Sequence, residues 1–194
     1  ASNEGKPEID VNAWLERGDV SRFGDYWPEN IMSGKTLRWL RTSLLNGLVE
    51  NGRYSMVGDM DDFPFLDHSG RLQAIAPVKN ASLKYVDGWP QARQVDAVAY
   101  FEGPGMFVEG SVGSAAGTRI EKVTAHIGDF KAAVLDVNWQ TSTELPALIR
   151  FIKQTTLLDN IDLDLEQFVL SGKSSISGRL NAKLGGSKKP IEVN

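Results

Sequence analysis

Alternation of apolar and polar residues runs through most of this 194-residue chain and constrains its fold more than any other feature. The clearest case is the segment 175–184, whose apolar members are Ile176, Gly178, Leu180, Ala182 and Leu184. Because successive side chains of a strand point to opposite faces, this pattern predicts strands with one apolar and one polar face. The short connections between such segments favour antiparallel pairing.

The same pattern predicts at least nine strands and leaves room for two short helices. We expect strands at 49–57, 71–76, 81–86, 94–101, 106–110, 120–127, 131–139, 161–166 and 175–184, with Gly52 at a bend or bulge. Helices are expected at about 35–46, capped by Ser33 and stopped by Gly47, and at about 143–154, with Pro146 in the first turn. Residues 11–17 are expected to form a helical turn or an irregular lead-in. The fold class predicted is mainly β, or α+β by count.

Composition and charge exclude several classes of protein. The net charge is -4 and the pI is about 5.3, so the chain lacks the basic character of a nucleic-acid-binding domain. There is no cysteine, which removes disulfides and thiolate chemistry. No apolar run reaches the roughly 18 residues that a membrane helix needs. The polar ends predict a lead-in at 1–25, a β segment at 26–185 and a tail at 186–194, within a longer protein.

The residues that could carry chemistry have simpler interpretations. The acidic group Asp59, Asp61 and Asp62 lacks the spacing of a calcium loop, and a turn is favoured. The carboxylates of 162–166 alternate along a predicted strand, which favours a solvated face over a glycosidase pair. The glycine-rich segment 110–117 lacks a phosphate-loop motif, so a hairpin loop is expected. The two histidines, His68 and His126, lie in no known catalytic motif, and we expect neither an enzyme nor a cofactor.

An ordered set of residues in the first half of the chain resembles a known family. These residues are Trp39-Leu40, Gly47, Val49, Gly52, Gly58, Met60, Asp62-Phe63-Pro64-Phe65, Gly70, Leu72, Ala74, Tyr85 and Trp89-Pro90. The set resembles the central region of the YhdP-type members of the AsmA-like family of Gram-negative bacteria. The likeness extends from about Tyr26 to Leu184.

The resemblance implies a fold and a function that composition does not show. Family members are long envelope proteins, anchored in the inner membrane and reaching through the periplasm toward the outer membrane. They resemble bridge-like lipid transfer proteins, in which an extended, curved sheet forms an open apolar groove for acyl chains. The resemblance therefore implies phospholipid as cargo and adjoining segments of the same protein as partners. It also implies a periplasmic location, membrane contact through other parts of the protein, and no catalytic motif.

A groove for acyl chains needs apolar side chains on one face of the sheet and polar ones on the other, which antiparallel strands supply. Small residues would leave room for the chains. The residues expected to line the groove are Ala97, Ala99, Met106, Val108, Leu163, Leu165, Ile176 and Leu180. The alternation also fits a β-sandwich that serves as an interaction or sugar-binding module, which exposed aromatic platforms would favour.

Overall fold

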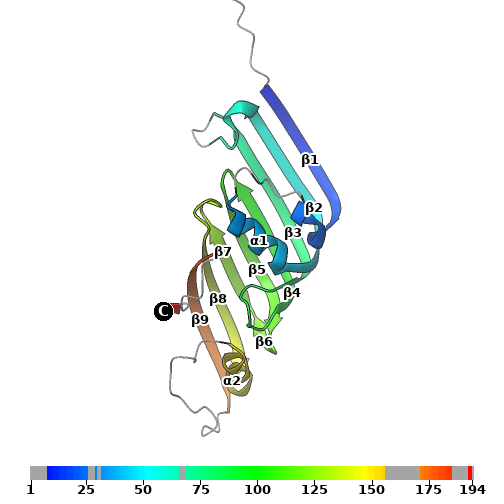
Figure 1. Cartoon of the computed structure of the whole chain (residues 1–194). Coiled ribbons are helices and arrows are strands. Elements are labelled where there is room, and N and C mark those ends of the chain that lie inside the picture. The colour runs from blue at the N-terminus through cyan, green and yellow to red at the C-terminus, as the bar shows by residue number, and fades with distance from the viewer. Residues whose placement is uncertain are drawn as a thin grey trace, which may run out of the picture.

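The computed structural model describes residues 8–25, 29, 32–65, 69–155, 171–184 and 192–193. They form one ten-stranded antiparallel sheet in the order β1-β2-β3-β4-β5-β7-β8-β9-β10, with β6 paired to β5 (Figure 1). The strands are β1 Glu8–Asp19, β2 Leu44–Asp59, β3 Arg71–Leu83, β4 Ala92–Glu102, β5 Gly105–Ala115, β6 Thr118–Ile120, β7 Lys122–Ile127, β8 Val134–Glu144, β9 Lys173–Lys183 and β10 Glu192–Val193. The helices are α1 Gly34–Ser43 and α2 Leu145–Lys153, with 3-10 turns η1 Val20–Asp25 and η2 Met60–Asp62.

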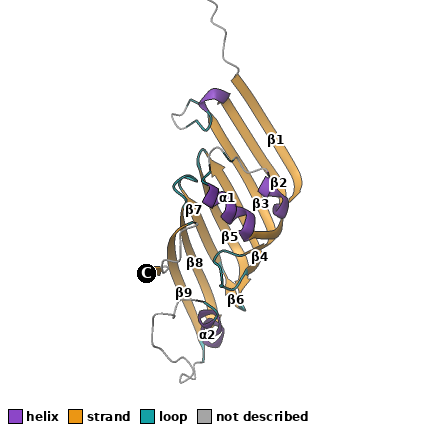
Figure 2. Ribbon diagram, viewed as in Figure 1, coloured by secondary structure: helices purple, strands orange, loops and turns teal. Residues whose placement is uncertain are grey.

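The predicted fold class is confirmed: the chain is a curved antiparallel sheet with two short α-helices (Figure 2). Its outer strands, β1 and β10, do not pair with each other, so the sheet of the described residues is open. All the described strands belong to this one sheet, and the β-sandwich that we kept as an alternative is therefore not the fold of this part of the chain.

A line of irregularities crosses the middle of the sheet. The register shifts in β2, β3 and β4 where Gly47, Asn80 and Gln94 have positive φ of 139°, 50° and 54°. Bulges of this kind bend a strand and increase its local twist. Because the bulges lie on neighbouring strands, they bend the sheet as a whole.

Helix α1 begins where the sequence predicts but ends earlier. The Ser33 side chain accepts a hydrogen bond from the backbone N–H of Thr36, as a helix N-cap does. We expected the helix to continue to residue 46 and to stop at Gly47, and this is wrong, since β2 starts directly at Leu44. Gly47 lies in that strand, where an added Cβ would come within 3.0 Å of Ala81. Glycine is needed at position 47 because the strand bulges there and lies close to the neighbouring strand.

Two further expectations are wrong. Residues 11–17 are part of strand β1, which pairs with β2 over nearly its whole length, and do not form a helical turn. The glycine-rich segment 110–117 is mostly strand: β5 runs to Ala115, and only the turn before β6 remains as a loop. The segments 71–76 and 81–86 are largely covered by the single strand β3, and 143–154 contains α2. The division of the chain at residues 25 and 185 stays a prediction.

Candidate functional site

One face of the sheet is apolar across all its long strands. In one row of residues paired from strand to strand, the members are Ala76, Ala99, Val108, Ala125, Val137 and Leu180, from β3 to β9. A neighbouring row, from β1 to β7, contains Ala13, Tyr54, Ala74, Phe101, Met106 and Ile127. Side chains directly opposite one another on paired strands share a face. We call this surface the apolar face.

Helix α1 covers the middle of the apolar face (Figure 1). Its Leu37 and Leu40 belong to one buried cluster with Met106, Ile127 and Leu135 from β5, β7 and β8. Ile127 is 0% exposed and Leu40 is 3% exposed, so helix and sheet are in full contact here. The surface beneath α1 is thus closed to solvent in this structure.

Hydrogen bonds hold α1 at both ends. The Thr36 hydroxyl donates to the carbonyl oxygen of Phe130, in the connection between β7 and β8, over 2.8 Å. Near the other end, the Trp39 Nε1–H donates to the carbonyl oxygen of Tyr85 over 3.3 Å. Burial raises the pKa of the Tyr85 phenol to about 12. These bonds fix the helix to the β7–β8 connection and to the β3–β4 connection, which lie at opposite ends of the strands.

The part of the apolar face over β1 and β2 is left open. Val11 is 40% exposed and Leu15 is 38% exposed, and Tyr54 and Met56 beside them are half-buried. Burial raises the pKa of the Tyr54 phenol, whose hydroxyl donates to the Met56 sulfur over 3.2 Å. Exposed apolar surface of this kind, continuous with a buried core, is typical of a binding face.

The structure brings six of the eight predicted groove residues to this one face. Register places Ala97 beside Gly110 and Ala99 beside Val108, in line with Met106, Ile176 and Leu180. Met106 and Leu180 are buried, while the other four are half-buried. The predicted residues Leu163 and Leu165 lie outside the described residues. The residues of β1 are among those that sequence reasoning missed, because that segment was interpreted as a helical turn or a lead-in.

Some positions on the apolar face need glycine. The indole of Trp139 lies so close to Gly178, its cross-strand neighbour, that an added Cβ would enter the ring. A Cβ at Gly110 would come within 2.6 Å of the Val123 side chain. At these two positions a larger side chain of the neighbouring strand occupies the space that a Cβ would need.

The opposite face is mostly polar but carries a row of large side chains. From β1 to β7 the row contains Trp14, Arg53, Ile75, Tyr100, Phe107 and His126. Trp14 is 75% exposed, and the rings of Tyr100 and Phe107 lie 6.2 Å apart at a tilt of 31°. This row is the exposed aromatic platform that would suit the alternative binding module.

The row ends in a surface ion pair next to His126. Asp136, paired with His126 across β7 and β8, accepts hydrogen bonds from Asn181 at 2.8 Å and Arg179 at 3.1 Å. These two partners hold the pKa of the Asp136 carboxyl below its usual value. His126 is exposed on this open face. The second histidine, His68, lies outside the described residues.

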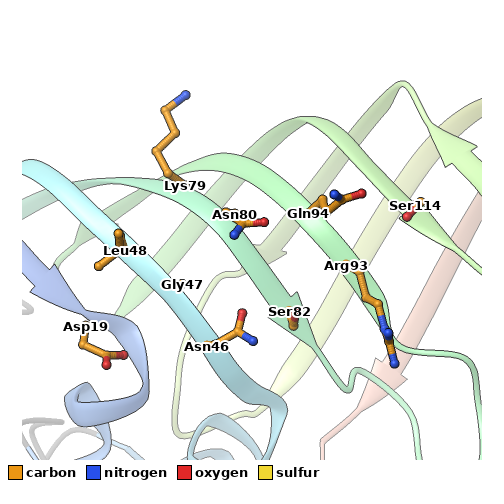
Figure 3. Close-up of a pocket in the computed structure, with 10 residues that line it drawn as sticks. All are labelled: Asp19, Asn46, Gly47, Leu48, Lys79, Asn80, Ser82, Arg93, Gln94 and Ser114. Atoms are coloured by element: carbon orange, nitrogen blue, oxygen red, sulfur yellow. The ribbon is translucent and has the colours of Figure 1, made fainter.

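A hollow of about 560 Å³ lies at the line of bulges (Figure 3). Polar side chains dominate its lining, and Figure 3 shows Lys79 and Gln94 on one side of the sheet and Arg93 on the other. Lys79 forms an ion pair with Asp96 at 2.9 Å, and the Asn80 backbone and Lys79 together lower the pKa of Asp96. A lining of this kind does not suit an apolar ligand.

The acidic segment after β2 forms a turn, as expected. The Asp59 carboxylate accepts the backbone N–H of Asp61 at 2.9 Å and so caps the 3-10 turn η2. Among the described residues, no group of three His, Asp or Glu side chains converges on a possible metal position.

These features agree with the comparisons with known proteins. The sequence model of the YhdP protein family matches residues 1–194, which is the whole chain. The chain belongs to the YhdP protein family. A relative in Escherichia coli K12, the intermembrane phospholipid transporter YhdP, is 23% identical over 181 residues. That match covers 93% of this chain but only 14% of the relative, and no solved structure matches.

The residues by which the sequence resembles YhdP proteins pack into the fold. The Phe63 and Phe65 rings meet edge to face at 5.8 Å. Phe65 lies over Gly58 and Gly70, where an added Cβ would come within 2.8 Å and 2.5 Å of its ring. Trp39 and Tyr85 hold α1, as described above. The family motif therefore fixes the end of β2 and the helix on the apolar face.

The two α-helices of the described residues are short, with ten residues in α1 and nine in α2. Neither α1 nor α2 is long and apolar enough to cross a membrane.

Proposed function

We propose that this chain is a segment of a lipid transport protein of the YhdP family, and that its apolar face carries the acyl chains of phospholipids between the inner and outer membranes. The observation that supports this most is the apolar row that continues across six strands from Ala76 to Leu180. Each methylene removed from water is worth about 0.8 kcal/mol, so a continuous apolar surface can hold an acyl chain without any specific contact. No bond is made or broken, and no cofactor is required.

The apolar face would separate the acyl chains of a lipid from its head group, as a bilayer does. Acyl chains lie against the apolar face, and head groups remain toward solvent at its open side. The groove residues proposed from the described part of the chain are Ala97, Ala99, Met106, Val108, Ile176 and Leu180. Val11 and Leu15 join them, because they are large apolar side chains exposed on that face of β1.

The chain spans about one seventh of the length of its E. coli relative. Its partners are therefore proposed within a longer protein. We propose that adjoining segments of the same long protein extend the groove at both ends, and that membrane contacts belong to those other parts. In this proposal the segment lies in the periplasm of a Gram-negative bacterium, as part of a protein anchored in the inner membrane.

The proposal is tested with two adjacent positions of β1. Val11 pairs with Met56 on the apolar face, while Asn12 pairs with Ser55 on the opposite face. An unpaired carboxylate against an acyl chain costs more than about 1.4 kcal/mol, so Val11→Asp should weaken binding of dioleoylphosphatidylglycerol to the purified chain at least about tenfold. Asn12→Asp adds the same charge to the same strand and should leave lipid binding unchanged.

Binding is measured by native mass spectrometry after incubation with vesicles, and circular dichroism confirms that both variants are folded. Equal binding by wild type and Val11→Asp, or equal loss in both variants, would reject the apolar face as the lipid site.

A second candidate function is favoured by the exposed row on the opposite face. Trp14, Tyr100 and Phe107 offer aromatic surface to a protein or sugar partner of the envelope. Replacing Tyr100 and Phe107 with Ala would abolish capture of such a partner and leave phospholipid binding intact. Loss of lipid binding in that double variant would instead show that lipid binds the face of Tyr100 and Phe107, and would contradict our assignment to the apolar face.

A further inference from the structure

We propose that the sheet surface beneath α1 is itself an acyl-chain site, and that α1 occupies it until lipid displaces the helix. This inference rests on the proposed function and adds a competition between helix and lipid for the same side chains. The site consists of Met106, Ile127 and Leu135 with the neighbouring Phe101 and Val108. Leu37 and Leu40 of α1 take the place of acyl methylenes.

The burial of these residues shows that helix and lipid exclude each other. Ile127 is 0% exposed, Leu135 is 6% exposed and Met106 is 8% exposed. A surface covered to this extent has no space for a further chain of carbon atoms. Lipid can contact these residues only where Leu37 and Leu40 have left them.

The position of α1 makes this competition unavoidable for a lipid that moves along the face. The row Ala13, Tyr54 and Ala74 leads directly to Phe101 and Met106, which lie in the covered cluster. Apolar residues continue beyond it on β9, at Leu180 and Ala182. The apolar face thus runs on both sides of α1, and the covered cluster lies between them.

The contacts of α1 suit a helix that can be exchanged. Of the four buried residues of the helix, only Leu37 and Leu40 are apolar, and its outward positions Lys35, Arg38 and Arg41 are charged and exposed. The Thr36 hydroxyl bond to Phe130 is the one buried side-chain anchor of its first turn. A ten-residue helix released from its sheet has little stability of its own, so release should unfold it.

The first experiment measures amide hydrogen exchange in the unmodified chain, with and without vesicles of dioleoylphosphatidylglycerol. Displacement predicts faster exchange of the α1 amides when lipid is bound, while β4 and β5 remain protected. Unchanged or slower exchange in α1 on lipid binding would overturn the inference. Because this measurement needs no variant, it does not depend on how any substitution folds.

The second experiment uses a matched pair of threonines on α1. Thr36→Val removes the hydroxyl that bonds to the Phe130 carbonyl and to the Ser33 side chain, and leaves the 3.3 Å backbone bond from the Ser33 N–H to Phe130. Thr42→Val removes a hydroxyl that bonds only within the helix, to Arg38 and Trp39. A diazirine amino acid is placed at Val108, under the helix, or at Val11, on the open part of the face. With the same labelled lipid, Thr36→Val should raise adducts at Val108 about fivefold relative to Val11, the effect expected for one lost hydrogen bond. Thr42→Val should not.

The outcomes separate this inference from the proposed function. Adducts at Val11 with none at Val108 in any variant would overturn the exchange of helix and lipid and leave the apolar face as a lipid site. No adduct at either position would overturn both. Adducts at Val108 that respond equally to Thr36→Val and Thr42→Val would show that release of the Phe130 anchor is not what opens the site.

Discussion

Ile127 lies at the centre of the surface on which α1 packs, and its truncation gives a quantitative test of the face assignment. The side chain is 0% exposed and belongs to the cluster with Leu40 and Met106. Ile127→Ala removes three carbon atoms, which is about 2.4 kcal/mol of transfer free energy at about 0.8 kcal/mol per methylene. The cavity that remains adds to this cost, so we expect a loss of about 3–4 kcal/mol in the free energy of unfolding.

Phe107→Ala serves as the control, because Phe107 lies on the next strand but on the opposite face. It is 39% exposed and its main described ring contact is with Tyr100. Its truncation should cost about 1–2 kcal/mol, the sum of partial burial and one aromatic pair. Urea unfolding followed by circular dichroism measures both, with stability compared at constant m-value. A larger loss of unfolding free energy for Phe107→Ala than for Ile127→Ala would refute the assignment of the hydrophobic core to the face of the sheet that α1 covers.

Two other predictions concern the last strands of the sheet. Gly178→Ala should displace the Trp139 indole, with a red shift in its fluorescence and a loss of about 1–3 kcal/mol from overpacking; an unchanged spectrum would contradict the contact. The pKa of Asp136 is lowered by Asn181 and Arg179, so its contribution to stability is present above the unfolded pKa of about 3.9 and fades as pH falls through the folded value. Arg179→Gln should raise the carboxyl titration midpoint of Asp136 in NMR, and an unmoved midpoint would show that the ion pair is not formed in solution.

The sequence allowed the two faces to be predicted because alternation is a local property of each strand. Ala97, Ala99, Met106 and Val108 follow a period of two, and register does bring them to one face. The same signal was present in β1, where Ile9, Val11, Ala13 and Leu15 alternate. We expected a helical turn or a lead-in at 11–17, because the strand forms only by pairing with β2, which lies far away in the sequence.

The position of α1 could not be predicted from the sequence. Its amphipathic pattern indicates that Leu37 and Leu40 lie on the face of the helix that becomes buried, but it does not indicate which surface buries them. The bulges at Asn80 and Gln94 were also missed, because a residue with positive φ in a strand depends on the register of its neighbours. These non-local features explain why Met106 was predicted as an open groove residue and is buried beneath a helix.

Phospholipid is proposed to lie on only one face of this sheet, and two neighbouring residues of β2 test this directly. Met56 and Ser55 are adjacent in β2 and point to opposite faces, Met56 beside Leu72 and Ser55 beside Gln73. A diazirine amino acid at each position, irradiated with labelled phospholipid vesicles, compares the faces at the same place in the sheet. We expect lipid adducts at Met56 and none at Ser55. Equal labelling at both positions, or labelling at Ser55 alone, would contradict it.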